Sequence, residues 1–246
     1  MPYSSLATLY DRINGDVYAP YALFLDRTIR EYSKIAVQDV LDLGCGTGKI
    51  TALMADKGYG MVGVDLSAEM LNLAREANEG KNTLLLMQDM REFELYGTVQ
   101  AVYSSFDCLN YLENAADLRK VFRLVANYLE PGGVFVFDVN TEYRFREVYG
   151  ENVFTYEFED DLLVWRNEPL AGKTGTRFVL DRFFDRRADG TCRFEHEEQT
   201  EVFHPEKRIL LACSAAGLIP VAKFGGLDCE PVKETSEKVF YVVRRN

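Results

Sequence analysis

Short apolar runs alternate with longer amphipathic stretches from position 38 onward. Apolar runs of this length are typical of buried strands, and apolar residues at helical spacing are typical of helices that pack on a sheet. The pattern predicts strands over residues 40–43, 61–65, 84–88, 101–104 and 134–138. It predicts helices over 48–57, 68–79 and 115–129, the last ended by Pro131-Gly132-Gly133. This order of elements indicates a parallel sheet with crossover helices.

The pattern changes after Asn140, where aromatic and charged residues alternate as far as residue 204. The runs 176–186 and 191–203 flank Ala188-Asp189-Gly190, a sequence suited to a hairpin turn. A helix is then predicted from Pro205, as its first residue, to about residue 216, followed by strands near 221–224 and 238–244. Residues 5–34 are predicted to form one or two helices across the open end of the sheet.

We therefore expect an α/β fold with a doubly wound, mostly parallel seven-stranded sheet. Residues 1–140 and 205–246 would form this core. Residues 141–204 would form an inserted antiparallel β subdomain, so that the insertion interrupts one domain and does not follow it.

Composition narrows the possible partners. The 246 residues are 47% hydrophobic, enough to bury a core without disulfides. The formal net charge of −11 is opposite in sign to the basic surface that nucleic acids and anionic membranes normally require. No apolar run approaches the length of a membrane span. The first residues do not resemble a secretion signal. We expect a cytoplasmic protein that does not bind membranes, and nucleic acids are disfavoured as partners.

The five cysteines are odd in number, scattered, and without a C-x-x-C pair. A disulfide framework and a structural zinc site are both disfavoured, and no metal is expected. Each cysteine is interpreted as a small buried hydrophobic residue.

Candidate chemistry begins at the loop after the first strand, where Gly44, Gly46 and Gly48 alternate with other residues. Such a loop lets the backbone approach a ligand at the carboxyl end of the sheet. The spacing fits neither G-x-G-x-x-G, whose sixth place is Lys49, nor G-x-x-x-x-G-K-[ST], which disfavours dinucleotides and nucleoside triphosphates. Asp42 would repel a pyrophosphate, and it suits a ligand that carries an amino group or a sulfonium.

Two further strand ends carry carboxylates. Asp65 follows Gly44 by 21 residues, a position from which a carboxylate takes both ribose hydroxyls. Asp89 and Met90 end the third strand and suit an adenine amino group and ring. An alternative is that the glycines serve packing, that the two aspartates cap helices, and that Met70 is core. The set in correct order favours binding, and for Met70 alone both interpretations stay open.

These motifs resemble those of class I S-adenosylmethionine-dependent methyltransferases, which have a Rossmann-like fold. DLGCGTG resembles the first motif, VDLS with Met70 the second, QDM the third, and LEPGG the approach to the strand after the catalytic loop. The resemblance implies S-adenosyl-L-methionine as cofactor, with the 44–48 loop on its methionine part, Asp65 on the ribose, Asp89 with Met90 on the adenine and Asp42 near the amino group. The expected cofactor-binding residues are Tyr3, Asp42, Gly44, Cys45, Gly46, Gly48, Asp65, Leu66, Met70, Asp89, Met90 and Phe106.

A narrower resemblance is to small-molecule enzymes with an inserted β lid, such as amino-sugar N,N-dimethyltransferases. It rests on the opening from Tyr3 to Asp11, the run 90–93, and the strand that holds Glu195 to Glu198. It implies in-line methyl transfer to nitrogen or oxygen of a small-molecule acceptor, with residues 141–204 as an acceptor-binding lid.

The expected catalytic residues follow from this resemblance. The loop after the fourth strand would face the methyl group, so that Asp107, Asn110 and Tyr111 are candidates to orient the acceptor. The alternative is that they are loop caps and a packed ring. Tyr111 stands where the amino-sugar enzymes have a histidine proposed as base, so an imidazole base is not expected there. His196 lies among glutamates that would raise its pKa and attract a cationic acceptor; the alternative is a solvated strand face paired with arginines.

Other functions stay open on the sequence alone. A protein that binds S-adenosylmethionine or S-adenosylhomocysteine without catalysis would keep the same loop and aspartates. A protein or RNA acceptor is a further alternative, whereas an oxidoreductase is disfavoured by the glycine spacing. The sequence does not decide between a monomer and a homodimer.

Overall fold

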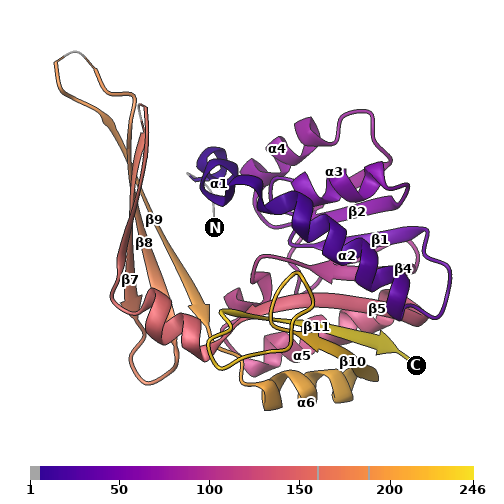
Figure 1. The fold of residues 1–246 in the computed structure, drawn as a ribbon. Helices are drawn as coiled ribbons and strands as arrows, with labels where there is room; N and C mark the ends of the chain where they lie inside the picture. The colour runs from indigo at the N-terminus through magenta and orange to yellow at the C-terminus, as the bar shows by residue number, and fades with distance from the viewer. Residues whose placement is uncertain (1–5, 160, 188) are drawn as a thin grey trace.

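The main layer of the computed structural model, which describes residues 6–159, 161–187 and 189–246, is a seven-stranded sheet (Figure 1). Its strands are β1 (Asp39–Leu43), β2 (Gly60–Asp65), β3 (Thr83–Met87), β4 (Val99–Ser104), β5 (Leu129–Asn140), β10 (Leu218–Phe224) and β11 (Lys238–Arg245). They run in the order β10-β11-β5-β4-β1-β2-β3, with β1 to β5 parallel and β10 and β11 antiparallel to their neighbours. The predicted fold class is confirmed.

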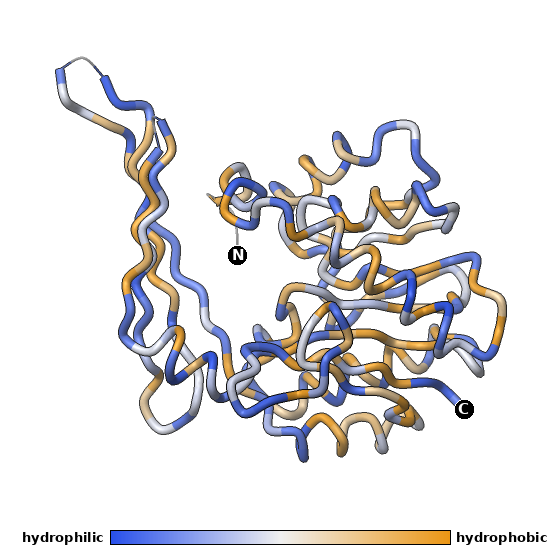
Figure 2. Tube along the Cα trace, viewed as in Figure 1, coloured by the Kyte–Doolittle hydropathy of each residue, from blue (hydrophilic) through white to orange (hydrophobic). Residues whose placement is uncertain are grey.

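Helices cover both faces of this sheet. They are α1 (Ala7–Asn14), α2 (Tyr18–Tyr32), α3 (Lys49–Asp56), α4 (Ala68–Ala77), α5 (Ala115–Tyr128) and α6 (Glu206–Ala216), with short turns η1 (Gly15–Val17), η2 (Cys108–Tyr111) and η3 (Arg144–Tyr149). One buried cluster joins α2 and α3 to the sheet through Val40, Tyr103 and Val136. Another joins α5 and α6 to the opposite face through Phe135 and Phe137. Figure 2 shows the hydrophobic residues gathered on the central strands between these layers.

Several predicted boundaries were wrong. Helix α5 ends at Tyr128, and β5 begins at Leu129, so that Pro131-Gly132-Gly133 lies inside a strand that bends at Gly132 (φ +85°). Helix α2 covers a face of the sheet, because its apolar side is wide enough to pack there, and only α1 lies at the carboxyl edge. Pro205 is the N-cap of α6 and not its first residue. Cys192 is exposed beside the hairpin turn, and so is not a core residue.

A second, four-stranded antiparallel sheet is inserted between β5 and α6. Its strands are β6 (Val153–Phe158), β7 (Asp161–Pro169), β8 (Gly175–Phe184) and β9 (Arg193–Val202), in sequence order. Its apolar residues, among them Leu163, Phe178 and Leu180, pack against Leu9 of α1 and Phe145 of η3. Figure 1 shows this sheet beside the main one, with α1 between them. The β8–β9 hairpin was predicted, whereas β6 and β7 were not predicted individually.

The insertion leaves and re-enters the core at one place. Asn110 of η2 accepts a hydrogen bond from the Asn140 backbone N–H through Oδ1 (2.9 Å) and donates Nδ2 to the Val202 carbonyl (2.8 Å). Asn140 ends β5 and Val202 ends β9, so one buried side chain fastens both ends of the insertion.

No helix in the described part of the chain is long and apolar enough to cross a membrane.

Candidate functional site

The glycine loop between β1 and α3 needs its three glycines for different reasons. Gly44, Gly46 and Gly48 have φ of +89°, +52° and +70°, which L-amino acids rarely adopt. A Cβ on Gly44 would lie 2.6 Å from Cys108 Sγ, and one on Gly48 would lie 2.6 Å from Asn78 Nδ2. A Cβ on Gly46 would meet no atom within 4 Å. Gly44 and Gly48 therefore serve packing as well, whereas Gly46 faces open space.

Asp65, at the end of β2, holds this loop in place. Its Oδ2 accepts a hydrogen bond from Gly46 N and its Oδ1 accepts one from Ser67 N, both at 2.8 Å. Burial raises the pKa of Asp65, against these two bonds. Each oxygen keeps a further lone pair for a ligand hydroxyl.

Asp42 lies beneath the loop and is fully buried. Its Oδ2 accepts hydrogen bonds from Thr51 Oγ1 (2.5 Å) and Tyr103 OH (2.8 Å). Its Oδ1 is buried without a hydrogen-bond partner among the described residues. Burial raises the pKa of Asp42 to about 7, against those two hydrogen bonds. A buried acceptor without a donor is costly, so this oxygen suits a donor supplied by a ligand.

Two adjoining cavities open above these carboxylates. The smaller, of about 50 Å³, is lined by Cys45, Gly46, Met70 and Phe106, among others. The larger, of about 400 Å³, runs along the ends of β2 and β3 past Asp65, Leu66, Asp89, Met90 and Tyr111. Gly44, Asp65 and Cys108 line both, so the two form one elongated space. Gly48 lines neither and starts α3.

Asp89 is engaged by its neighbour Arg91. Arg91 donates its backbone N–H to Asp89 Oδ1 (2.8 Å) and its Nε to both carboxylate oxygens (2.9 and 3.0 Å). These bonds hold the pKa of Asp89 below its ordinary value. Any ligand amino group at this strand end would meet an ionised carboxylate.

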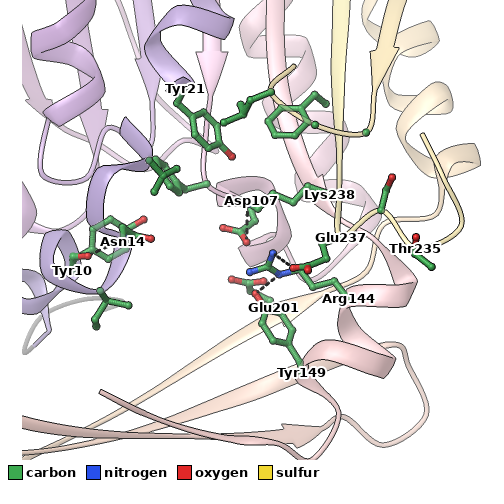
Figure 3. A pocket seen from close by; sticks show the side chains of 18 of the residues that line it. Tyr10, Asn14, Tyr21, Asp107, Arg144, Tyr149, Glu201, Thr235, Glu237 and Lys238 are labelled. Carbon is green, nitrogen blue, oxygen red and sulfur yellow. Dashed lines mark hydrogen bonds and ion pairs between the residues drawn. The ribbon is translucent and has the colours of Figure 1, made fainter. Parts of the chain in front are cut away.

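A third cavity, of about 660 Å³, lies between the main sheet and the inserted sheet (Figure 3). Tyr10 and Phe106 line both this cavity and the small one at the glycine loop. Its apolar wall is formed by Leu163, Trp165 and Leu180 of β7 and β8. The loop from Gly225 to Glu237 closes another side. The small cavity therefore adjoins this third cavity at Tyr10 and Phe106, and it adjoins the 400 Å³ cavity at Gly44, Asp65 and Cys108.

The loop that carries Phe106 is strained. Phe106 and Asp107 have φ of +55° and +54°, in the left-handed region that costs side-chain-bearing residues energy. The Phe106 ring stacks on Tyr21 at 4.5 Å, and Asp107 N donates to Asp138 Oδ2 at 2.9 Å. Those contacts stabilise the turn that directs the Asp107 side chain into the third cavity (Figure 3).

Charged side chains meet in this cavity from five segments of the chain. Lys238 Nζ lies 3.2 Å from Asp107 Oδ2 and 2.7 Å from Asp138 Oδ2. Arg144 donates Nη1 to Glu237 (2.9 Å) and Nε to the Tyr149 hydroxyl (2.9 Å). Burial opposes ionisation of Asp107, but Lys238 and Arg144 outweigh it and lower the pKa of this carboxyl.

The sequence-predicted catalytic residues are not all brought together here. Asp107 lines the third cavity, and Tyr111 lines the second and donates to Gln199 Oε1 (2.8 Å). Asn110 is buried between the two backbone groups named above and lines none of these cavities.

His196 also lines none of the three cavities. It is half-exposed, with Nδ1 2.7 Å from Asp181 Oδ1, a contact that raises its pKa. Strand alternation places it on the opposite face of β9 from Glu197 and Glu201. Tyr3 lies outside the described residues.

Three residues that line the third cavity were not predicted from the sequence: Arg144, Tyr149 and Lys238. It was also not predicted that Glu201 would line this cavity apart from its neighbour His196. The sequence of β9 did not mark this face, since every residue from 195 to 201 is polar; only the structure shows that Glu197, Gln199 and Glu201 are the buried ones. A strand whose buried face is polar indicates a lined cavity more than a packed core.

Comparison with known proteins identifies the family. A family model described as a methyltransferase domain matches residues 40–133. The curated relative "Putative methyltransferase YqeM" from Bacillus subtilis (strain 168) is 31% identical over 254 residues, covering 100% of this chain and 98% of the relative. The chain belongs to the S-adenosylmethionine-dependent methyltransferases.

This methyltransferase also resembles a solved structure and a second curated enzyme. An S-adenosylmethionine-dependent methyltransferase from Clostridium acetobutylicum has a TM-score of 0.87 and 28% identity, with 99% of each chain covered. The dTDP-3-amino-3,6-dideoxy-alpha-D-glucopyranose N,N-dimethyltransferase of Streptomyces fradiae is 34% identical over 134 residues, 53% of this chain and 51% of that enzyme. The resemblance to class I enzymes is confirmed.

The site of this methyltransferase fits S-adenosylmethionine on three observations. Asp42 Oδ1 is buried without a partner beneath the loop, Gly46 leaves open space there, and the joined cavities, which Asp42 itself does not line, run from that loop to Asp89. When bound, this cofactor supplies a methyl group on a positively charged sulfur. The polypeptide has to hold it and exclude water from the transfer.

Proposed function

We propose that this methyltransferase transfers a methyl group to nitrogen or oxygen of a small molecule that binds in the 660 Å³ cavity between the two sheets. The observation that carries the proposal is the shared wall. Tyr10 and Phe106 line both this cavity and the cavity at the glycine loop, so a molecule in one would adjoin a molecule in the other. In-line transfer needs that proximity.

On this proposal the cofactor-binding residues divide along the elongated space. Gly44, Cys45 and Gly46 would contact the methionine part and Asp42 would lie near its ammonium group. Asp65 would accept the ribose hydroxyls through the lone pairs that Gly46 and Ser67 leave free. We base these roles on position, since each residue stands where a parallel sheet presents groups to a ligand.

At the other end of the space, Leu66, Asp89 and Met90 would contact the adenosine part, because all three line the 400 Å³ cavity beyond Asp65. Phe106 would lie beside the junction of cofactor and acceptor, and Met70 would line the small cavity. Gly48 would act indirectly, by allowing α3 to approach Ala74 and Asn78.

The inserted sheet is the second support for a small acceptor. Three of its four strands contribute residues to the wall of the cavity. A walled cavity suits a small molecule, whereas a macromolecule would bind to an open surface. A drug-sized molecule occupies a pocket of about 300–1,000 Å³. The Streptomyces fradiae relative, whose name specifies an amino-sugar acceptor, agrees with a small-molecule acceptor.

The test is methyl transfer from S-adenosylmethionine to a panel of small amines and hydroxyl compounds, read by mass spectrometry of the product and by formation of S-adenosylhomocysteine. Thr235→Trp would place a ring in the cavity from its exposed lining loop and should lower turnover about tenfold or more, with S-adenosylhomocysteine affinity unchanged. Glu234→Trp, an exposed neighbour outside the cavity lining, is the matched control. Equal loss in both variants, or no transfer to any panel member, would contradict the proposal.

A further inference from the structure

Glu201 is the most unusual ionisable group in the acceptor cavity. It lies on β9, is 2% exposed, and lines the 660 Å³ cavity. Its Oε2 accepts a hydrogen bond from Asn140 Nδ2 at 2.9 Å. Its Oε1 has no hydrogen-bond partner among the residues that the structure describes, and Figure 3 shows the carboxylate directed into the cavity.

Glu201 differs from the other carboxylates of this cavity because they form ion pairs and it does not, among the described residues. Asp107 pairs with Lys238, Glu230 with Lys233, and Glu237 with Arg144. Glu201 has no ion pair within the described chain. The cations of the cavity are thus already paired, and an ionised Glu201 would be left without a partner of opposite charge.

A second carboxylate lies next to it. Asn140 Nδ2 donates to Asp107 Oδ2 at 2.6 Å as well as to Glu201 Oε2 at 2.9 Å. Two oxygens at those distances from one nitrogen are at most 5.5 Å apart. Figure 3 shows both carboxylates on the same side of the cavity. One ammonium group could therefore contact both.

We propose that the acceptor of this methyltransferase is an aliphatic amine, bound between Asp107 and Glu201 as its ammonium form, and that Glu201 takes the proton which frees the nitrogen for methylation. This inference rests on the proposed function and narrows it from nitrogen or oxygen to nitrogen. A buried, unpaired carboxylate is stabilised by a cation and not by a neutral hydroxyl compound, which is the physical reason for the choice.

The reaction balances as follows. The ammonium gives one proton to Glu201 Oε1 and becomes a neutral amine with a lone pair. That nitrogen forms a bond to the methyl carbon, while the electron pair of the broken carbon–sulfur bond remains on sulfur. The products are an N-methylammonium, S-adenosylhomocysteine and a protonated Glu201, which returns its proton to solvent once the product leaves.

The surroundings of Glu201 suit this role. Burial and the charge of Asp107 raise its pKa well above the ordinary value, against Lys238, the Asn140 hydrogen bond and Arg144. Tyr149, whose own pKa is raised by burial and by Glu201, also faces it from η3. A carboxylate with a raised pKa is a stronger base for an ammonium than one at its ordinary value.

The experiment compares matched amines and alcohols with the full-length protein saturated with S-adenosylhomocysteine. Cyclohexylamine against cyclohexanol, and D-glucosamine against D-glucose, are titrated calorimetrically. We expect at least one amine to bind at least tenfold more tightly than its alcohol. Glu201→Gln keeps the size and hydrogen-bonding capacity of the side chain and should remove that preference, while S-adenosylhomocysteine affinity stays unchanged.

Glu195→Gln is the matched control. Glu195 lies on the same strand and the same face, but it pairs with Arg182 and lines none of the three cavities. It should keep the amine preference. If Glu201→Gln fails to fold, the wild-type comparison still decides, and Glu201→Asp, which retains the charge, should retain the preference.

Turnover of amine substrates separates this proposal from the function on which it rests. With any amine that the wild type methylates, Glu201→Gln should lower kcat about 100-fold and remove the acidic limb of the pH profile. Equal binding of amine and alcohol, no binding of either amine, or an unchanged pH profile in Glu201→Gln would each overturn the amine site. Methylation of alcohols alone would overturn it and keep the proposed function, whereas Glu201-dependent amine binding without any methyl transfer would support the amine site and contradict the proposed function.

Discussion

Replacement of Gly46 by alanine tests whether the glycine loop is built for a ligand or for packing. Gly46 has φ +52° and open space where a Cβ would stand. In the free protein, Gly46→Ala should therefore lower the free energy of unfolding by about 1–2 kcal/mol, which is the cost of placing alanine at positive φ. In the complex, the added methyl group would occupy space that the ligand needs. The binding free energy should weaken by about 1–3 kcal/mol, which corresponds to roughly a 5- to 150-fold rise in the Kd for S-adenosylhomocysteine.

Two other glycines provide controls for Gly46→Ala. Gly217, at the end of α6, also has a left-handed conformation with no atom within 4 Å of the position that a Cβ would take, and it lies outside the three cavities. Gly217→Ala should match the stability loss and leave the Kd unchanged. Gly48→Ala should lose more stability, about 2–4 kcal/mol, because its Cβ would clash with Asn78 and Ala74.

The assays are denaturant unfolding of the free proteins and calorimetric titration with S-adenosylhomocysteine. The reasoning fails if Gly46→Ala binds as tightly as the wild type, or if Gly217→Ala weakens binding as much as Gly46→Ala does.

Three further outcomes are expected. Asp65→Ala should weaken S-adenosylhomocysteine binding by about 1–3 kcal/mol in calorimetry, since the ribose hydroxyls lose their acceptor; unchanged affinity would refute the assignment. Burial lowers the pKa of His204 to about 4, so the unfolded chain binds more protons than the folded chain between pH 4 and 6.5. The free energy of unfolding, measured by denaturant titration, should therefore fall by about 3 kcal/mol as the pH drops through that range. A His204→Gln variant should not show this pH dependence. Burial raises the pKa of Asp42 from 3.8 to about 7, so the folded chain keeps a proton that the unfolded chain releases, and stability falls as the pH rises from about 3.8 to about 7. At pH 8 Asp42→Asn should therefore be more stable than the wild type in denaturant titrations and should bind S-adenosylmethionine more weakly. A variant that unfolds more easily than the wild type at pH 8 would contradict this.

The cofactor half of the fold could be predicted because its signals are local. Each buried strand is a short apolar run ended by polar or glycine residues, and parallel strands bring their carboxyl ends to one edge. Asp65 and Asp89 could thus be placed near one another although 24 positions separate them in the chain. The glycines at 44, 46 and 48 carried their own conformational signal, which the positive φ values confirm.

The proposed acceptor cavity could not be predicted in the same way, because its groups come from distant segments. Asp107, Glu201 and Lys238 meet only once the inserted sheet folds back toward β11, and no periodicity in the chain indicates that approach. His196 was a candidate because glutamates surround it in the sequence, but strand alternation turns it to the opposite face of β9 from Glu201. The end of α5 was placed one residue late because Pro131-Gly132-Gly133 suggested a helix stop and instead bends a strand.

The fastening of both ends of the inserted sheet at Asn110 has a consequence for how such enzymes diversify. One side chain holds the last residue of β5 and the last residue of β9, so the two ends of the insertion stay at one place in the core. Between these ends the inserted sheet also packs on Leu9 of α1, and Gln199 accepts a hydrogen bond from Tyr111. On the proposed function, exchange of residues 141–201 between relatives that keep these contacts should change the acceptor and leave the strands of the main sheet in place.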